Sequence, residues 1–500
     1  MYQQDWMAKW AIYRPHKTAV KEQGTGRSLT YLELNRCANR TACFLINNFK
    51  IKKGDRIAIL AENCLEYIVL FSAAQKTGAV LVPLNYRLAP AEIEYLIADA
   101  KPKLLVYENM FLGKIKGVLQ KENGLKKWTI KELNKLCKKP FGTKDGFFEI
   151  NPVEENDPIF ILYTSGTTGF PKGAIYSHKM LFWNSINTAM SLVINTESRT
   201  VNCMPPFHTG GWNVLTTPFL HHGGYICLMK NFDPKTVLVL LQKEKASMFM
   251  GVPTMLKMMA DEPGFAEADL SHLYYMIVGG EPMPIPLIEI WHRKNVPVRQ
   301  GYGMTEVGPN LTSLHQDDAI RKKGSIGRPN FYVEIKIIDK NGNKVTGGEA
   351  GELLLKGPMV TPGYWQNKPA TEKAFSDGWF HTGDMVRQDG EGYLYVVDRI
   401  KNMFISGGEN IYPAEIERVI LGHGAVSEVA VVGVPHEKWG EVGKAYIVKK
   451  TNAGLNKNDL MDFCKSKLAK FKVPKFFVFI NKLPKNDMGK IDREALKNWA

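Results

Sequence analysis

A repeated alternation of short apolar runs with helix-like segments is the feature that most constrains the fold. Between residues 56 and 107 the runs RIAIL, AVLVPL and KLLVY are separated by two helix-like stretches. The same rhythm returns between residues 159 and 300. A strand that helices cover on both faces reads as a continuous apolar run, so this rhythm is typical of a parallel sheet with flanking helices. The sequence predicts a large α/β unit with one sheet or two similar sheets.

The pattern changes after residue 324. YVEIKIID and GELLLKG flank an Asn-Gly turn, which predicts a small β subdomain at about 325–398. From residue 393 a strand, a basic stretch, a helix at 413–421 and further strands predict a small, independent α+β domain. We therefore expect an N-terminal domain at 1–399 and a C-terminal domain at 402–500, with the boundary near Arg399 to Asn402.

Composition is that of an ordinary globular protein, with 44% hydrophobic and 23% charged residues. The seven cysteines form no C-x-x-C pair, so we expect reduced thiols rather than a zinc or redox site. The N-terminus lacks the basic and apolar run of a secretory signal. Glu66, Gln75 and Lys76 interrupt the longest apolar stretch, which therefore cannot cross a bilayer unaided. We expect a cytoplasmic protein.

The formal net charge of +15 predicts attraction of anions, which include nucleotides, coenzyme A, acidic membrane surfaces and nucleic acid. RNA-binding and zinc-finger patterns are missing, and the aromatic residues are not interleaved with the basic runs. We therefore expect no nucleic-acid partner. Peripheral contact with an anionic membrane and a homodimer remain open, and a basic, non-enzymatic binding protein is the remote alternative.

A hydroxyl- and glycine-rich segment is the most informative motif. It follows the strand-like IFIL and precedes a helix-like run after Ser177. Glycines leave main-chain N–H groups free to turn toward phosphate oxygens, and hydroxyls add donors. The segment therefore predicts a polyphosphate site. Its residues are Thr164, Ser165, Gly166, Thr167, Thr168, Gly169 and, beyond a proline, Lys172.

A Walker A loop is the rival interpretation of this segment. That motif requires Gly, Lys and Ser or Thr in succession, whereas this chain has Pro171, Lys172 and Gly173. Two required positions fail, which argues against a P-loop NTPase.

The segment closely resembles the phosphate-binding signature of the adenylate-forming enzymes, a superfamily of acyl-CoA synthetases, nonribosomal adenylation domains and firefly luciferase. Further motifs of that family match in order along essentially the whole chain: GYGMTE at 301–306, TGD at 382–384, the stretch 398–417 and PKNDMGK at 484–490. Fatty-acyl-CoA ligases are the members that the chain most resembles. The resemblance implies an acyl-CoA synthetase that uses ATP, Mg²⁺ and coenzyme A.

Local chemistry agrees with the adenine and phosphate contacts that the resemblance implies. Gly280 and Glu281 follow an apolar strand, where ligands bind in open α/β sheets. An aromatic ring can stack on adenine, a hydroxyl can donate to a phosphate, and a carboxylate is a hard ligand for Mg²⁺. The resemblance assigns Glu306 to the metal, with help from Thr164. The remaining nucleotide contacts fall on Tyr302, Gly303, Met304 and Thr305.

Catalytic roles also follow from the resemblance. Asp384 is expected to bind the ribose hydroxyls, and Arg399 the ribose or a phosphate. Lys490 is expected to stabilise the charge that develops at the α-phosphate during adenylation. His208 is expected to orient the substrate carboxylate or to gate the approach of the thiol, and an ordinary structural histidine is the alternative.

The implied reaction joins a carboxylic acid to AMP and then transfers the acyl group to a thiol. We expect the C-terminal domain to turn about Lys401, so that Lys490 withdraws and a face with Ser406, Gly407 and Gly408 approaches the thiol. A medium- or long-chain fatty acid is the first substrate hypothesis, and an aryl or short-chain acid is the alternative. Loading of a carrier-protein pantetheine is the alternative to free coenzyme A.

Overall fold

The structure is a computed structural model, which describes residues 5–121, 124–140, 152–164, 171–280, 283–345, 347–406, 409–451, 453–468, 470–486 and 489–499. It divides into two compact units. The first comprises Met1–Glu334 and Leu355–Phe380, and the second comprises Ile335–Leu354 and His381–Ala500. A domain boundary and hinge at Lys401 stay predictions.

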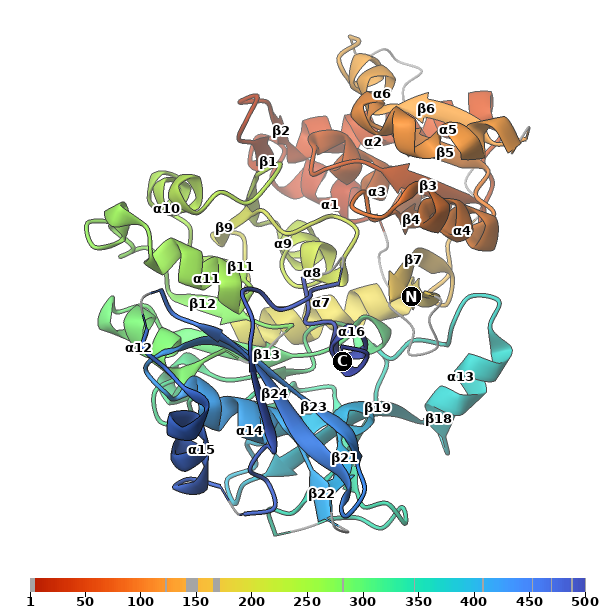
Figure 1. Cartoon of the computed structure of the whole chain (residues 1–500). Coiled ribbons are helices and arrows are strands. Elements are labelled where there is room, and N and C mark those ends of the chain that lie inside the picture. The colour runs from red at the N-terminus through yellow and green to blue at the C-terminus, as the bar shows by residue number, and fades with distance from the viewer. Residues whose placement is uncertain are drawn as a thin grey trace. The chain divides into compact units, whose positions relative to one another are not determined.

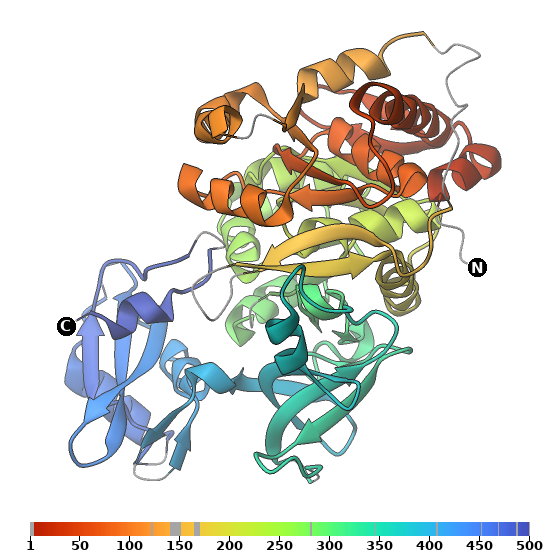
Figure 2. The same cartoon turned by 90° about the vertical axis from the view of Figure 1, so that its right-hand side faces the viewer.

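Two sheets form the centre of the first unit, so the interpretation with two sheets is confirmed (Figures 1 and 2). Each has a parallel core with antiparallel strands at its edge. The six-stranded sheet runs in the order β6 (Lys126–Thr129), β5 (Leu104–Tyr107), β3 (Arg56–Leu60), β4 (Val80–Pro83), β7 (Pro158–Thr164) and β8 (Lys172–Ser177). The nine-stranded sheet runs in the order β15 (Arg328–Pro329), β14 (Thr312–Ser313), β13 (Val298–Tyr302), β12 (Tyr275–Val278), β11 (Met248–Gly251), β9 (Arg199–Asn202), β10 (Tyr225–Leu228), β1 (Thr18–Glu22) and β2 (Ser28–Thr30).

Helices connect these strands, and their ends follow ordinary capping chemistry. Thr30 caps α2 in a capping box with Glu33, and prolines begin several of the other helices. The α-helices of this unit are α1 (Trp6–Tyr13), α2 (Tyr31–Phe49), α3 (Leu65–Thr77), α4 (Pro90–Ala100), α5 (Leu112–Lys121), α6 (Ile130–Cys137), α7 (His178–Leu192), α8 (Thr209–Trp212), α9 (Thr216–His222), α10 (Pro234–Lys243), α11 (Pro253–Ala260), α12 (Ile285–Arg293) and α13 (Lys368–Ala374). Short 3₁₀ helices are η1 (Asn109–Phe111), η2 (Pro263–Phe265), η3 (Thr305–Val307) and η4 (Gln316–Asp318).

Helix α3 is buried along its whole length, and its apolar residues share one core with residues of both sheets. Its charged residues are neutralised by partners from elsewhere in the unit. Lys76 Nζ lies 2.6 Å from Asp5 Oδ2, and Glu66 Oε1 lies 2.6 Å from Arg27 Nη1. A buried charge is tolerated only when it is paired and hydrogen-bonded. The interrupted apolar stretch is therefore a core helix followed by the buried strand β4.

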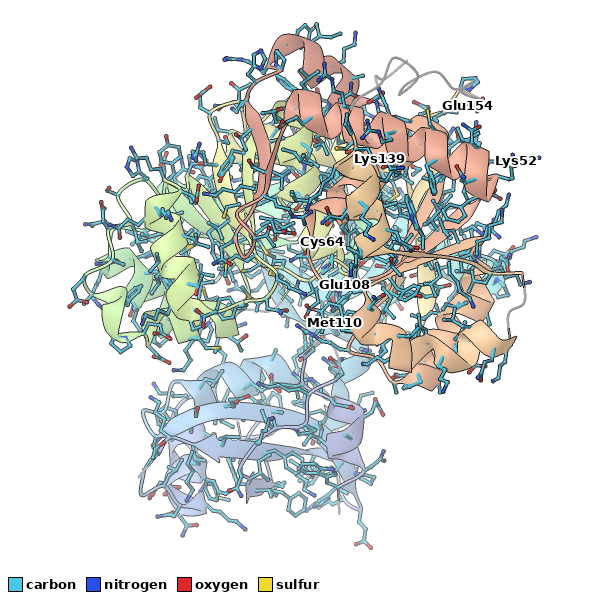
Figure 3. The ribbon with its side chains drawn as sticks, turned by 90° about the horizontal axis from the view of Figure 1, so that it is seen from above. Lys52, Cys64, Glu108, Met110, Lys139 and Glu154 are labelled. Atoms are coloured by element: carbon cyan, nitrogen blue, oxygen red, sulfur yellow. The ribbon has the colours of Figure 1, made fainter. Side chains whose placement is uncertain are left out.

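In the described part of the chain, no helix has both the length and the apolar character that crossing a bilayer requires. The seven cysteines are thiols rather than disulfides, and five of them are buried. Cys64, labelled in Figure 3, immediately precedes α3, and burial raises its pKa well above the usual value. A high pKa keeps this thiol protonated and unreactive.

The β subdomain predicted at about 325–398 appears as a five-stranded sheet. Strand β19 pairs antiparallel with both β18 and β20. The strands are β16 (Glu334–Ile338), β17 (Ala350–Lys356), β18 (Phe375–Ser376), β19 (Trp379–Gln388) and β20 (Leu394–Arg399), and η5 (Ile400–Asn402) follows.

The C-terminal part of the second unit is α+β, as predicted. A five-stranded sheet packs its apolar residues against α14 and α15 in one core. Its strands are β21 (Phe404–Ser406), β22 (Glu409–Ile411), β23 (Val426–His436), β24 (Gly440–Lys449) and β25 (Phe476–Phe479). The helices are α14 (Pro413–Leu421), α15 (Lys457–Lys465) and α16 (Arg493–Lys497).

Candidate functional site: a nucleotide-binding centre

Glu306 is anchored through one of its two carboxylate oxygens. The hydroxyl of Tyr364 donates to Glu306 Oε1 at 3.0 Å, and Thr164 Oγ1, at the end of β7, donates to the same atom at 3.5 Å. The N–H of Thr361 donates to the backbone carbonyl of Glu306 at 2.7 Å. Burial, and secondarily the charge of Glu306, raises the pKa of Tyr364, so its hydroxyl remains a donor. Glu306 Oε2 accepts no hydrogen bond from the described residues and can face a cation.

Lys172 lies directly opposite Thr164, because β7 and β8 pair antiparallel. Strand β8, which was not predicted, therefore follows the signature, and the helix predicted after Ser177 begins at His178 as expected. Lys172 Nζ lies 5.5 Å from the centroid of the Tyr364 ring, beside the anchored carboxylate. The predicted residues Ser165, Gly166, Thr167, Thr168, Gly169 and Glu281 lie outside the described residues.

The adenine motifs lie at the carboxyl ends of two neighbouring parallel strands. β12 ends just before Gly279 and Gly280, and β13 ends at Tyr302. A Cβ atom on Gly279 would lie 3.5 Å from the carbonyl oxygen of Gly301, so the two segments nearly touch. Gly280 has a φ of +85°, which favours glycine. The structure thus brings these two predicted segments together at the edge where open α/β sheets bind ligands.

Gly303 fixes the turn that leads from β13 to Glu306. A Cβ atom there would lie 2.3 Å from the carbonyl oxygen of Pro309, so no other residue fits without moving the backbone. Met304 and Thr305 follow, and η3 begins at Thr305. The tight turn carries the chain from the strand end to the metal-binding candidate.

Asp384 and Arg399 are brought together in the second unit by strand register. They face each other across β19 and β20, and Arg399 Nε lies 2.8 Å from Asp384 Oδ1. The aspartate side chain is 4% exposed, whereas that of Arg399 is 46% exposed. Thr382 Oγ1 accepts from the Asp384 N–H at 3.0 Å. A buried carboxylate held by an accessible guanidinium can face a ribose while the arginine reaches an anion.

Lys401 lies in η5, next to a buried carboxylate that joins three segments. Asp398 accepts from the N–H of Arg399 at 2.6 Å, from Asn402 Nδ2 at 3.0 Å and from the N–H of Ala414 at 2.8 Å. Ala414 is in the first turn of α14, where a carboxylate also favours the helix dipole. Asp398 therefore fixes both ends of the turn that contains Lys401.

Ser406 ends β21, pairs with Gly440 and is buried. Gly407 and Gly408, the other residues assigned to the thiol face, lie outside the described residues.

Lys490 is exposed at the end of a tight turn. The N–H of Lys490 donates to Asn486 Oδ1 at 3.1 Å, and the N–H of Asn486 donates back to the Lys490 carbonyl at 2.8 Å. Gly489 has a φ of +78°, which the turn requires. These two hydrogen bonds hold the backbone of Lys490 against Asn486.

His208 immediately precedes α8 and is half-buried, with its ring 4.7 Å from that of Phe207. Gly211 behind it allows a close turn, since a Cβ atom there would lie 2.2 Å from the carbonyl oxygen of Pro205. The geometry places His208 in the first unit beside buried aromatic residues, and its role stays a prediction.

Sequence reasoning missed Tyr364 and Asp398. Tyr364 lies in an irregular segment that forms a bridge with Ala174 of β8, so no periodicity marks it. Asp398 falls inside a matched family stretch, but its role as an acceptor depends on α14 folding back onto β20. For Tyr364 the local signal is an aromatic pair with Trp365 in a segment without periodicity, and for Asp398 it is a carboxylate shortly before a helix.

Mg²⁺ fits this arrangement. It prefers oxygen ligands and keeps several waters or phosphate oxygens, so a single oriented carboxylate such as Glu306 suits it. Among the described residues, no group of three or more His, Cys, Asp or Glu side chains forms a metal cage. Glu306 would hold the ion with nucleotide phosphates, and Mg²⁺ would neutralise their charge.

Comparison with known proteins agrees with this geometry. The model of the "AMP-binding enzyme" family matches residues 7–365, and that of the "AMP-binding enzyme C-terminal domain" matches residues 415–490. The chain is 37% identical to a feruloyl-CoA synthase of Amycolatopsis sp, covering 97% of this chain and 96% of that protein. It is 36% identical to the long-chain-fatty-acid–CoA ligase FadD13 of Mycobacterium tuberculosis, covering 98% and 97%.

A solved structure of o-succinylbenzoate CoA synthetase from Bacillus subtilis, with the acyl-adenylate intermediate OSB-AMP, covers 100% of this chain and 99% of its own. Its TM-score is 0.89 at 31% identity. Another structure of the same enzyme contains ATP and a magnesium ion.

The fold, the motifs at the ends of β12 and β13 and the anchored carboxylate of Glu306 together define an adenylate-forming enzyme. The chain belongs to the AMP-binding enzyme family, in which it is an acyl-CoA ligase that uses ATP, Mg²⁺ and coenzyme A.

Proposed function

We propose that the enzyme activates a carboxylic acid with a hydrophobic body and transfers its acyl group to coenzyme A. The carboxylate attacks the α-phosphorus of ATP to give acyl-AMP and pyrophosphate, and the thiol then displaces AMP to give the thioester. The anchored Glu306 carboxylate carries this proposal, because it provides a fixed metal ligand beside Thr164 and Lys172.

The surroundings of His208 support a hydrophobic acid. Phe207 and Trp212 are buried nearby, and the atoms closest to a Cβ on Gly210 would be the methyl groups of Met204 and Met250. Methionine side chains adapt to apolar ligands of different shapes. A medium- or long-chain fatty acid and an aromatic acid both satisfy this chemistry, and the relatives named above act on acids of both kinds according to their names.

We assign nucleotide contacts to the strand-end segments and to the second unit. Gly280, Tyr302 and Met304 contact adenine, and Thr305 donates to the α-phosphate. Asp384 and Arg399 bind the ribose or a phosphate, which the buried carboxylate and accessible guanidinium support. Ser406 contributes to the thiol face.

Lys490 supplies positive charge to the transition state of the first step, and the chain turns about Lys401 for the second. The exposure of the Lys490 side chain, whose backbone is hydrogen-bonded to Asn486, supports the first assignment. The second is supported by the position of Lys401 in the short η5, which connects β20 to the C-terminal sheet.

The test is a screen for AMP release with saturated fatty acids of graded length and with ferulic, indoleacetic and 2-succinylbenzoic acids. Each acid is assayed with and without coenzyme A, and the thioester is detected by mass spectrometry. Glu306→Gln, which keeps the shape of the side chain, is the inactive control. The proposal predicts coenzyme-A-dependent AMP release with at least one hydrophobic acid. Acyl-AMP that accumulates without thioester, or no turnover by the folded enzyme, would overturn it.

A further inference from the structure

A cation-lined hollow of about 320 Å³ lies beside β1, β9 and β10, near one edge of the nine-stranded sheet. Thr18, Arg199 and Tyr225 are the first residues of these parallel strands. The hollow is therefore at the amino ends of these strands, whereas Gly280 and Tyr302 lie at the carboxyl ends of β12 and β13. The residues that line it are Lys17, Thr18, Lys21, Ser28, Arg199 and Tyr225.

Strand register gathers these side chains on one face of the sheet. Lys21 is opposite Cys227 on one side and Ser28 on the other, and Arg199 is opposite Tyr225. Directly paired residues project to the same face of a sheet, and residues two positions apart along a strand share that face. The strand pairing therefore places the side chains of Lys21, Ser28, Arg199 and Tyr225 next to one another on this face.

One buried carboxylate holds two of the cations in place. Glu244 follows α10, and its Oε1 accepts from Lys21 Nζ at 2.7 Å while its Oε2 accepts from the Tyr225 hydroxyl at 2.7 Å. Arg199 Nε donates to the Glu244 carbonyl at 2.6 Å, and its guanidinium carbon lies 4.1 Å from the Tyr225 ring centroid. Lys21 and Arg199 are thus pre-organised, so a ligand would not have to order them.

Lys17 differs from both. Its Nζ forms no hydrogen bond or ion pair with the residues that the structure describes. Burial lowers the pKa of Lys17, and the positive charges of Arg14 and Arg199 act in the same direction, against the opposing effect of Glu197. A half-buried ammonium among other cations is unfavourable without an anion nearby.

We propose that this hollow binds a phosphomonoester dianion. The charged groups around the hollow are Lys17, Lys21, Arg199 and Arg14 with Glu244 and Glu197. They leave a net charge of about +2, which matches a phosphate group of charge about −2. Lys17 contributes the charge-assisted hydrogen bond that its present surroundings lack, and the hydroxyls of Thr18 and Ser28 add donors. The volume is in the range of small-ligand sites. The phosphate can come from a soluble metabolite or from a lipid headgroup.

The test compares the native enzyme with Lys17→Glu while AMP fills the nucleotide site. Lys116→Glu is the matched control, because Lys116 is exposed on α5 and undergoes the same change of charge. Glycerol 3-phosphate is titrated by calorimetry at constant ionic strength. Sedimentation with phosphatidylcholine vesicles, with and without phosphatidic acid, tests the lipid source. Thermal unfolding checks that each variant folds.

We expect saturable binding in one or both arms that Lys17→Glu weakens by about tenfold or more and Lys116→Glu leaves within about twofold. Loss in the calorimetric arm identifies a soluble ligand, and loss only in the vesicle arm identifies a headgroup. Arg199→Gln should weaken the same binding. The proposal fails if the native enzyme binds neither probe, or if both glutamate variants behave alike.

Discussion

Tyr364 and Glu306, fifty-eight positions apart in the chain, share a 3.0 Å hydrogen bond that leaves one carboxylate oxygen of Glu306 to face a cation. Tyr364→Phe removes the donor and keeps the ring. We expect the Mg²⁺ concentration for half-maximal AMP release to rise about tenfold, because a hydrogen bond to a charged group contributes roughly 1.5–3 kcal/mol. The KM for the acid should stay within about twofold.

Tyr274→Phe is the control for this substitution, since Tyr274 is 68% exposed and loses the same hydroxyl. Steady-state rates at varied Mg²⁺ measure the effect. An unchanged Mg²⁺ requirement in Tyr364→Phe would show that the hydroxyl does not orient the metal ligand.

Lys490→Ala should separate the two half-reactions. The ammonium acts on charge that develops only during adenylation, so that step should slow by about 10²- to 10³-fold. Thioester formation from supplied acyl-AMP should be largely spared, because it places no new charge on a departing pyrophosphate. Quenched-flow assays of each half-reaction measure this.

Lys482→Ala, an exposed lysine of the same unit, should leave both steps unchanged. If Lys490→Ala slowed both half-reactions equally while the protein stayed folded, the proposal that the C-terminal domain turns about Lys401 between the two steps would be wrong.

Local sequence patterns predicted elements well and long-range contacts poorly. The continuous apolar runs of β3 and β12 identified buried parallel strands, because burial on both faces demands such runs. The interpretation of the phosphate signature overlooked β8, whose residues KGAIYS begin inside the motif. Its short length and the glycine conceal the alternation that marks a strand.

The sequence identified individual candidate site residues but not which of them contact one another. Asp384 and Arg399 were each expected at the nucleotide, yet their ion pair follows from the β19–β20 register, which no local motif specifies. Tyr364 reaches Glu306 only because its segment lies along β8. A single sequence does not encode such proximity in a readable form, because it depends on how separate elements pack.

Asp384→Asn should abolish discrimination between ATP and its 2′,3′-dideoxy analogue. A carboxylate accepts from both ribose hydroxyls, whereas an amide turns a donor toward one of them. We expect the native preference for ATP, measured as a ratio of kcat/KM, to fall by about tenfold or more in the variant. Asp377→Asn, an exposed aspartate, is the control. Retained discrimination would place the ribose elsewhere.

Acid should destabilise the protein through buried histidines, of which His178 is the clearest. Burial lowers its pKa to about 4, whereas the unfolded chain binds the proton near pH 6.5. Between these values the unfolded state carries the extra proton, so the free energy of unfolding falls as the pH drops from about 6.5 to about 4. Each such histidine contributes a slope of about 1.4 kcal/mol per pH unit.

His178→Gln removes this titration. Between about pH 6 and about pH 5, the free energy of unfolding of the variant should therefore fall less steeply than that of the native enzyme, by about 1.4 kcal/mol per pH unit. Urea unfolding at each pH measures the slope. Because the comparison uses slopes, any constant destabilisation by the substitution cancels. His272→Gln, at an exposed position, should keep the native slope. Equal slopes for the native enzyme and His178→Gln would mean that His178 takes up its proton as readily in the folded state as in the unfolded chain.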